Sequence, residues 1–395
     1  MSRDKIDATV DAKLKTYQDI ALAIHAKPEV SNYEFFACET LSKQLISEGF
    51  DVKVDVAGHR TGFDARYNSG KPGPVIAFLA EFDALEGIGH ACGHNLFGAI
   101  SCLAGVALKS VIDKTGGEVR VYGTPGEEGG ENGSSKASFV REGFFKDVDA
   151  ALCVHPGYNN GPTGSALAIQ AVQVEFFGKS SHAAAIPEKG INALDAIIQV
   201  FNSLNAMRQH VTSDVRMHGI ITDGGKAPNV IPDYSCGKFY LRAASKPGVQ
   251  ELYDRFENIV KGAALATGCT FKYFRYQNEV DNVIPTPSFD KIYEKHLNHY
   301  GEFFDPNPSK GSGSTDVGNV SQVIPTLHTH IRISDHYVAG HSIEMREASC
   351  SQMGLDAIGI GAKVLAHTAL DLIEDEKLLA SLKSEHAQAV AAQGA

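Results

Sequence analysis

The chain has 395 residues, of which 43% are hydrophobic and 21% charged. This length and composition predict two domains with buried cores and exclude disorder, collagen and coiled coil. The 36 Lys and Arg residues against 47 Asp and Glu residues give a formal net charge of −11, and no basic run interrupts this balance. Such a surface repels a phosphate backbone, so nucleic acid is not expected as a partner.

The N-terminal residues 1–8 are charged and lack the apolar core of a signal peptide. No unbroken apolar run reaches the roughly 18 residues of a membrane span, so we expect a cytoplasmic protein that does not enter the membrane. The seven cysteines are odd in number and mostly lie among apolar neighbours. This predicts reduced core cysteines rather than a disulfide scaffold, with Cys92 as the exception among polar and glycine neighbours.

Apolar residues recur at helical spacing over 6–24 and 35–45, so two amphipathic helices open the chain. Apolar runs of strand length then alternate with helical stretches. The strand runs are 75–80, 119–122 and 150–154, and the helical stretches are 96–111 and 136–142. This alternation predicts an α/β domain with a largely parallel sheet, whose ligands bind beyond the carboxyl ends of the strands.

The pattern changes near residue 169 to strand, helix, strand, strand, helix, strand, which is the ferredoxin-like order. These elements are expected at 170–177, 191–207, 215–222, 236–244, 247–267 and 270–276. We therefore predict a compact α+β domain at 169–282, inserted into a first domain made of 1–168 and 283–395. A helix over 351–373 is expected near the C-terminus, and the last residues, 388–395, are expected to fray.

The strand at 75–80 leads into Glu81-Phe82-Asp83, and His90-Ala91-Cys92-Gly93-His94 follows at the start of the next helix. A thiolate and an imidazole two residues apart, separated by glycine, can bind one metal ion. The alternative is a buried cysteine beside a histidine that caps the helix.

The strand at 119–122 leads into a loop, 123–131, with three carboxylates and four glycines. Adjacent Glu127 and Glu128 can have different roles, one binding a metal ion and the other taking a proton from metal-bound water. The alternative is that the three carboxylates belong to a solvated turn. His155 follows the strand at 150–154. Because successive strands then deliver ligand-type residues to one sheet edge, a shared site is the stronger interpretation.

Further polar residues are less specific. His182 follows the first strand of the inserted domain, Asn229 and Arg242 lie near its later strands, and Ser314 and Thr315 belong to a polar loop. Each also has an ordinary structural interpretation. Sequence spacing does not choose among four late histidines as a ligand: His328, His330, His336 and His341.

Six blocks, in this order over nearly the whole chain, resemble the M20 family of metallopeptidases and amidohydrolases. They are 81–85, 90–95, 127–130, 181–193, 229–232 and 340–342. The segment Ser314-Thr315-Asp316-Val317-Gly318-Asn319-Val320-Ser321 is most similar to the branch of aminoacylase-1-like-2 (Xaa-Arg dipeptidase-like) proteins and aminobenzoyl-glutamate hydrolases.

The resemblance implies a hydrolase domain with two divalent metal ions, zinc or manganese, and an inserted domain that forms a homodimer. It implies Glu127 as general base and Asp83 as support for the metal site. It also implies that His182 stabilises the oxyanion in the partner subunit's site, and that Asn229, Arg242, Ser314 and Thr315 contact substrate. The implied metal ligands are Cys92, His94, Glu128, His155 and His341.

The chain departs from the wider family at Glu81-Phe82-Asp83, where many members have a His-x-Asp block. The resemblance implies that Cys92 provides the ligand that this block lacks, as in the auxin-conjugate amidohydrolases. A thiolate favours zinc, whereas this branch also uses manganese.

We therefore expect hydrolysis of the amide bond of a dipeptide or an N-acyl amino acid by metal-activated water. A catalytically idle relative that binds small peptides is one alternative. A thiol hydrolase that uses Cys92 with a histidine base is another, although His94 is spaced for joint metal ligation rather than as an oriented base.

Overall fold

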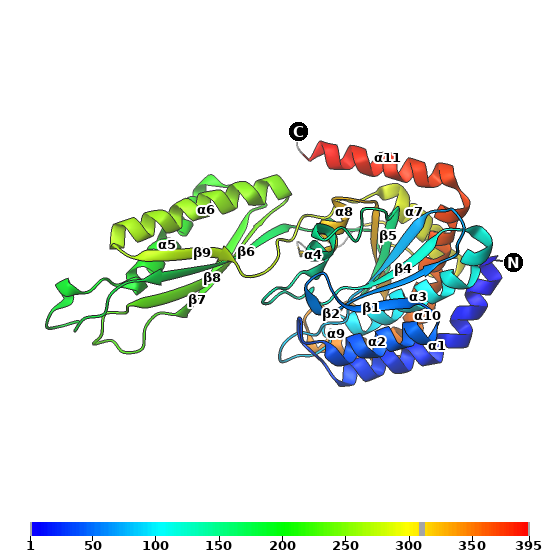
Figure 1. The fold of residues 1–395 in the computed structure, drawn as a ribbon, viewed down its shortest axis with the longest axis horizontal. Helices are drawn as coiled ribbons and strands as arrows, with labels where there is room; N and C mark the ends of the chain where they lie inside the picture. Colours follow the sequence, from blue (N-terminus) through cyan, green and yellow to red (C-terminus); the bar gives the residue numbers. More distant parts are fainter. Residues whose placement is uncertain (1, 308–312, 394–395) are drawn as a thin grey trace. The chain divides into compact units, whose positions relative to one another are not determined.

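The computed structural model describes residues 2–307 and 313–393. The chain forms two compact units (Figure 1): unit 1 comprises 1–165 and 283–395, and unit 2 comprises 166–282. The first boundary expected from the sequence lies slightly later, at 168/169, and the second lies at the same position.

Unit 1 contains a six-stranded sheet with the order β1-β2-β4-β3-β5-β10. The pairs β4 with β3, β3 with β5, and β5 with β10 are parallel, whereas β1 and β2 form an antiparallel edge. The predicted α/β class with a mostly parallel sheet is confirmed. The strands are β1 Asp51–Val56, β2 His59–Asn68, β3 Val75–Ala80, β4 Glu118–Gly123, β5 Ala150–Gly157 and β10 Thr326–Arg332.

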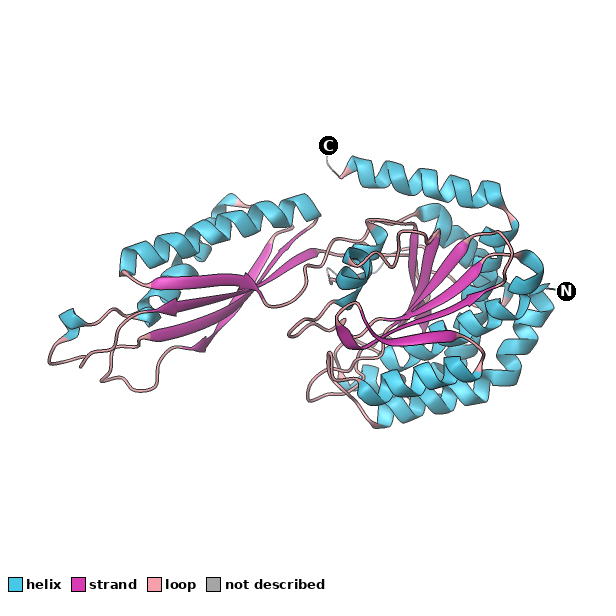
Figure 2. Ribbon diagram, in the orientation of Figure 1, coloured by secondary structure: helices cyan, strands magenta, loops and turns pink. Residues whose placement is uncertain are grey.

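Helices cover both faces of this sheet (Figure 2). Ile76 and Phe78 of β3 pack into one hydrophobic cluster with residues of α1, α3 and α10, while Ala77 and Leu79 pack into another with Phe139 of α4. Alternate residues of a strand point to opposite faces, so a strand buried on both faces is apolar throughout. The helices are α1 Ser2–Ala26, α2 Phe35–Ser47, α3 His94–Thr115, α4 Ser135–Arg141, α7 Pro287–His299, α8 Val317–Ser321, α9 Ile343–Ala348, α10 Gln352–Glu374 and α11 Glu376–Ala392.

The end of the chain differs from its prediction. Residues 388–392 were expected to fray, but they continue α11. Asp375 caps this helix by accepting hydrogen bonds from the backbone N–H groups of Lys377 and Leu378, and Leu379 and Leu382 are buried. An N-terminal cap and a buried apolar face both stabilise a helix, and α11 continues to Ala392.

Among the described residues, α3 is the one helix long and apolar enough to cross a membrane by length and composition. It reaches this length only when polar residues such as Asn95 and Ser101 are included, whereas the expectation concerned a continuous apolar stretch. Because 89% of its most hydrophobic window is buried inside the protein, α3 has the burial of a core helix.

Unit 2 contains an antiparallel sheet with the order β7-β8-β6-β9 and two long helices, the ferredoxin-like arrangement predicted from the sequence. Asn192 and Ser245 cap the two helices through their side chains. The strands are β6 Ala168–Phe177, β7 Arg216–Asp223, β8 Tyr234–Ala243 and β9 Thr270–Arg275, and the helices are α5 Ala193–Met207 and α6 Lys246–Thr267, with short 3-10 turns at Pro187–Lys189 and Arg208–His210.

Candidate metal centre

The carboxyl ends of three neighbouring parallel strands carry several of the predicted site residues. Asp83 follows β3, the loop with Glu127 and Glu128 follows β4, and His155 lies near the end of β5. His94 is the first residue of α3. The fold therefore gathers at one sheet edge residues that are far apart in the sequence.

Cys92, His94 and His155 form one group, whose potential ligand atoms lie within 4.8 Å of one another. Cys92 Sγ is 3.4 Å from His155 Nε2. Gly93, between Cys92 and His94, has φ of 79°, and a Cβ atom there would lie 2.9 Å from Pro156 Cβ. Only glycine fits this turn, so the residue that separates the two ligands is part of the site.

Cys92, Glu128 and His341 form a second group within the same 4.8 Å limit. His341 Nε2 is 3.3 Å from Glu128 Oε2, and the His341 backbone N–H donates to the Ala91 carbonyl at 2.9 Å. That bond ties the C-terminal histidine to the Cys92 loop. The thiol of Cys92 thus belongs to both groups.

Asp83 lies behind both groups. One of its carboxylate oxygens is 2.9 Å from Nδ1 of His94, and the other accepts a 2.9 Å hydrogen bond from the backbone N–H of Glu128. A carboxylate on the remote nitrogen of a histidine orients the ring and leaves its other nitrogen for a metal. Asp83 therefore contacts one member of each group.

The structure distinguishes the four late histidines. His341 reaches Glu128, whereas His336 is exposed and pairs with the neighbouring Asp335. His328 and His330 lie on β10 with ring centroids 5.9 and 5.8 Å from that of His155. Neither belongs to a described group of potential metal ligands.

The described groups fit divalent cations. His94 Nε2 and Glu128 Oε1 are buried and have no hydrogen-bond partner. Buried polar atoms normally have a partner, and a metal ion would provide one for each. Burial, followed by the carboxylates of Glu81 and Glu128, raises the pKa of Glu127 well above its usual range. Thiol, imidazole and carboxylate are the donor types that zinc and manganese take.

Three residues of this site were not predicted from the sequence. Glu81, noted there only as a departure from a motif, lies with His94 and Glu127 in a third group of potential ligands. Lys136 of α4 and Asp316 before α8 are fully buried and form an ion pair. Their sequence neighbours are small or polar, and nothing in the spacing indicates that they meet.

In unit 2, His182 and Asn229 lie together. His182 is exposed, and its Nδ1 accepts hydrogen bonds from the backbone N–H groups of Ala184 and Ala185, both at 3.2 Å. These bonds place the ring proton on Nε2, which is then a donor. The Ala183 backbone N–H donates to the Asn229 carbonyl at 3.1 Å.

Arg242 lies at the opposite end of the same sheet. It pairs in register with Ile169, whereas the end of β6 nearest His182 pairs with Tyr234 of β8. Strand geometry places Tyr234 and Arg242 roughly 25 Å apart. Within unit 2, Arg242 is therefore not brought together with His182 and Asn229.

Ser314 and Thr315 are half-buried in the loop before α8. The Thr315 hydroxyl accepts a 3.3 Å hydrogen bond from the Val317 backbone N–H. Asp316, the next residue, binds the Lys136 ammonium, which ties this loop to α4.

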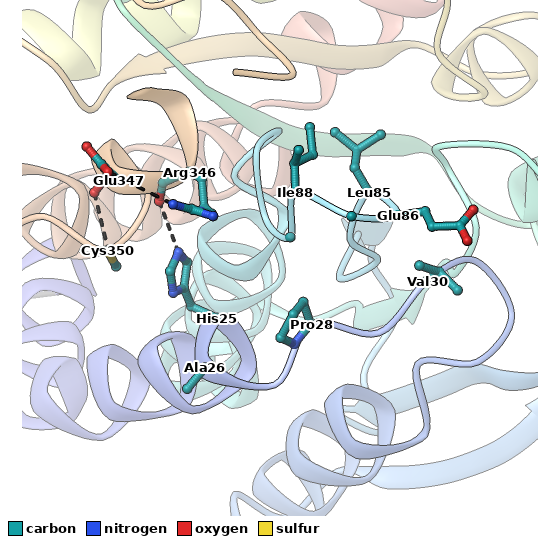
Figure 3. Close-up of a pocket in the computed structure, with 12 residues that line it drawn as sticks. His25, Ala26, Pro28, Val30, Leu85, Glu86, Ile88, Arg346, Glu347 and Cys350 are labelled. Carbon is teal, nitrogen blue, oxygen red and sulfur yellow. Dashed lines mark hydrogen bonds and ion pairs between the residues drawn. The ribbon is translucent and has the colours of Figure 1, made fainter. Parts of the chain in front are cut away.

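An open cavity of about 670 Å³ lies beside the loop 85–89 (Figure 3). Its walls come from the end of α1, this loop and α9, where His25 Nε2 is 3.0 Å from the Arg346 carbonyl. None of the predicted site residues lines it. The metal-ligand groups and this cavity are therefore separate features of unit 1.

The sequence of the chain is similar to those of known proteins. A family model described as a peptidase dimerisation domain matches residues 168–267. Human Xaa-Arg dipeptidase is 37% identical over 95% of this chain and 90% of its own length. One of the subunits of the p-aminobenzoyl-glutamate hydrolase of Escherichia coli is 37% identical over 75% of this chain and 65% of its own length.

Two solved structures show the same fold. An aminobenzoyl-glutamate utilization protein from Klebsiella pneumoniae aligns with a TM-score of 0.73 at 18% identity, covering 93% of this chain and 98% of its own. A Bacillus subtilis protein, described as a dinuclear metal binding peptidase from the M20 family, aligns with a TM-score of 0.61 at 19% identity, covering 92% and 99%.

The fold and the relatives define a hydrolase that acts on amide bonds, with an α/β domain and a separate dimerisation domain. The chain belongs to the M20 family of metallopeptidases and amidohydrolases, as the sequence resemblance implied.

Proposed function

We propose that this protein is a metal-dependent hydrolase that cleaves the amide bond of a dipeptide or an N-acyl amino acid. The observation that carries the proposal is that Cys92 belongs to two groups of potential metal ligands, with Asp83 bonded to a member of each. A shared thiolate between two sets of imidazole and carboxylate donors suits a pair of divalent ions.

Cys92, His94, Glu128, His155 and His341 would hold the two ions, zinc or manganese. When bound, the ions would lower the pKa of a water molecule and so supply the nucleophile at neutral pH. Asp83 orients the His94 ring and, through the Glu128 backbone N–H, the loop after β4. Ligand positions are then fixed before any substrate binds.

Glu127 is the proposed general base. Its Oε2 is 4.0 Å from His94 Nε2, and its side chain is 11% exposed, so it faces the site without belonging to either group that contains Cys92. It takes a proton from the attacking water and passes it to the amine nitrogen as the C–N bond breaks.

His182 is the proposed oxyanion donor, because its Nε2–H points away from the two backbone donors that satisfy Nδ1. Unit 2 begins and ends at one end of its sheet, where the backbones of Ile169 and Val280 pair. His182 follows the other end of β6, about 30 Å away along the strand. As the family resemblance implies, and because unit 2 matches a peptidase dimerisation domain, we propose a homodimer in which His182 serves the partner subunit's site.

The substrate class rests on the relatives. One is named for dipeptides that end in arginine and the other for p-aminobenzoyl-glutamate, so each name describes an amide whose amine part is an amino acid. We propose that Asn229, Arg242, Ser314 and Thr315 contact the substrate, Arg242 through a carboxylate. Because Asn229 and Arg242 lie at opposite ends of the unit 2 sheet, they would come from different subunits of the homodimer. We also propose that the enzyme is cytoplasmic.

A thiol hydrolase is the second candidate, because Cys92 Sγ lies 3.4 Å from a histidine nitrogen. Burial and the nearby Glu128 carboxylate raise the pKa of Cys92, however, which disfavours a free thiolate. An idle peptide-binding relative would have no use for the partly exposed Glu127.

A substrate screen tests the proposal. Purified protein is incubated with dipeptides and N-acyl amino acids in the presence of manganese, zinc or cobalt, and released amine is measured. Turnover of at least one amide with a metal, and none without, is expected. Binding of these compounds without any turnover would support the idle relative instead.

A further inference from the structure

Lys136 lies at the centre of a buried group of three charges beside the proposed metal site. Its ammonium is 2.7 Å from Glu81 Oε1 and 2.6 Å from Asp316 Oδ1, and all three side chains are about 1% exposed or less. The backbone N–H of Lys136 also donates to Asp316 Oδ2 at 3.0 Å. A lysine buried so completely persists only when carboxylates surround it.

The second oxygen of Glu81 faces the metal ligands. Glu81 Oε2 is 3.2 Å from His94 Nε2, and Glu81, His94 and Glu127 together form a group of potential ligands. Neither Glu81 oxygen accepts a hydrogen bond of good geometry among the described residues. Glu81 is therefore a hard oxygen donor, close enough to compete for a metal ion that His94 binds.

The ammonium of Lys136 opposes this competition. It neutralises the charge of Glu81, and its own contact with Asp316 holds it in place. A divalent ion that approached Glu81 would also approach this buried cation and be repelled in a medium of low dielectric constant.

We propose that Lys136 is a positioning residue that holds Glu81 as a lysine-paired carboxylate and keeps it from becoming a metal ligand. The two metal ions are then left with the thiolate, imidazole and carboxylate ligands named above. The inference rests on the proposed metal site and assigns to it the residue that limits its ligand set.

Cobalt as the bound metal provides a readout of ligand number that does not depend on turnover, because its visible absorption weakens as ligands are added. Four proteins are loaded with two equivalents of Co²⁺: wild type, Lys136→Met, Glu81→Gln and the double variant. Metal affinity is measured by titration calorimetry and stability by thermal unfolding.

In Lys136→Met, the freed Glu81 becomes a ligand. We expect weaker cobalt absorption and a dissociation constant lower by about tenfold or more, because one positive charge beside the site is lost. Glu81→Gln should bind metal more weakly but keep the wild-type spectrum. The double variant should return to the wild-type spectrum, since the Glu81 carboxylate that would bind the metal ion is absent from it. Lys363→Met, which removes another largely buried lysine paired with a carboxylate, is the matched control and should leave the spectrum unchanged.

Two results would overturn the inference. A changed spectrum in Glu81→Gln would mean that Glu81 is already a ligand. An unchanged spectrum in Lys136→Met, with only a lower melting temperature, would mean that Lys136 is purely structural. If Lys136→Met does not fold, the spectrum of Glu81→Gln still tests the inference, because any change in it would overturn the claim that Glu81 is not a ligand. Wild-type protein that binds no cobalt would instead contradict the proposed function itself.

Discussion

The sulfur of Cys92 lies 3.4 Å from Nε2 of His155. The same sulfur also belongs to the group with Glu128 and His341, so the Cys92 thiol stands between the two halves of the proposed centre. A metal bridge and a nucleophile with its base are both compatible with such a contact, and they predict opposite results when the sulfur is replaced.

Cys92→Ser should lose metal, because a hydroxyl is a poor ligand at neutral pH. Elemental analysis after dialysis should show less bound metal than in wild type, together with reduced amide hydrolysis. Cys350→Ser, which changes a half-exposed cysteine outside the ligand groups, is the control and should keep full metal content. Wild-type metal content with no activity in Cys92→Ser would favour the thiol hydrolase.

Glu127→Gln should keep both metals and the fold, yet lose turnover by about 10²- to 10⁴-fold, the usual contribution of a general base, or by more if Glu127 also protonates the leaving amine. Glu128→Gln is the matched variant and should lose metal, because its carboxylate is the one beside His341. Both variants are compared by metal analysis and steady-state kinetics. The reverse pattern would show that the roles of the two residues are exchanged.

His182→Ala should remain a dimer with intact metals and lose about 10²- to 10³-fold in rate, the contribution typical of one oxyanion donor. Mixing it with Glu127→Gln and reassociating the subunits should rebuild one native site in each mixed dimer. Because random exchange makes about half the dimers mixed, recovery should approach roughly a quarter of wild type. The exposed His210 provides a control, and His210→Ala should be fully active.

Subunit exchange has to be demonstrated independently, for example by native mass spectrometry. Exchange without recovery would place His182 in its own chain's site or give it a structural role only.

Asp290 of α7 should make stability depend on pH. Burial raises its pKa to about 6, although Thr163 donates two hydrogen bonds to it, from the backbone at 3.1 Å and the hydroxyl at 2.7 Å. Because the folded pKa lies above the unfolded value of 3.8, the stabilising effect of the protonated form is present below about pH 4 and is lost as pH rises through about 6.

Asparagine mimics the protonated acid and keeps the acceptor for Thr163. Asp290→Asn should therefore match wild type near pH 4 and exceed it at pH 8 by up to about 3 kcal/mol, measured by urea unfolding. Asp356→Asn, at an exposed aspartate, should show no such difference. Equal stability of Asp290→Asn and wild type at pH 8 would contradict the raised pKa.

The sequence predicted the elements that have strong periodicity. The three central strands of unit 1 and the ferredoxin-like order of unit 2 lie close to their expected positions. The edge hairpin of β1 and β2 was missed, since β1 is largely exposed and has no continuous apolar run. Pattern alone therefore indicated the apolar central strands. It missed strands of mixed sequence even where, as in β2 and β10, most residues are buried.

Candidate ligands that follow strand ends lie together, as the sequence indicated they would. Contacts between residues distant in the sequence could not be predicted from spacing. His341 was selected among four histidines by resemblance alone, and the structure adds its contact with Glu128. Lys136 was counted only as part of a helix, because its pairing with Glu81 and Asp316 joins segments distant in sequence. Such pairings depend on three-dimensional closeness, which residue spacing does not encode.

The most direct measurement is the activity of metal-free protein before and after metal is restored. Protein is stripped with a chelator, its metal content is verified by elemental analysis, and release of amine from a dipeptide or N-acyl amino acid that the intact protein hydrolyses is followed. We predict no turnover without metal and recovery of turnover as two equivalents of zinc or manganese are added. Full activity of the verified metal-free protein would contradict the proposed mechanism.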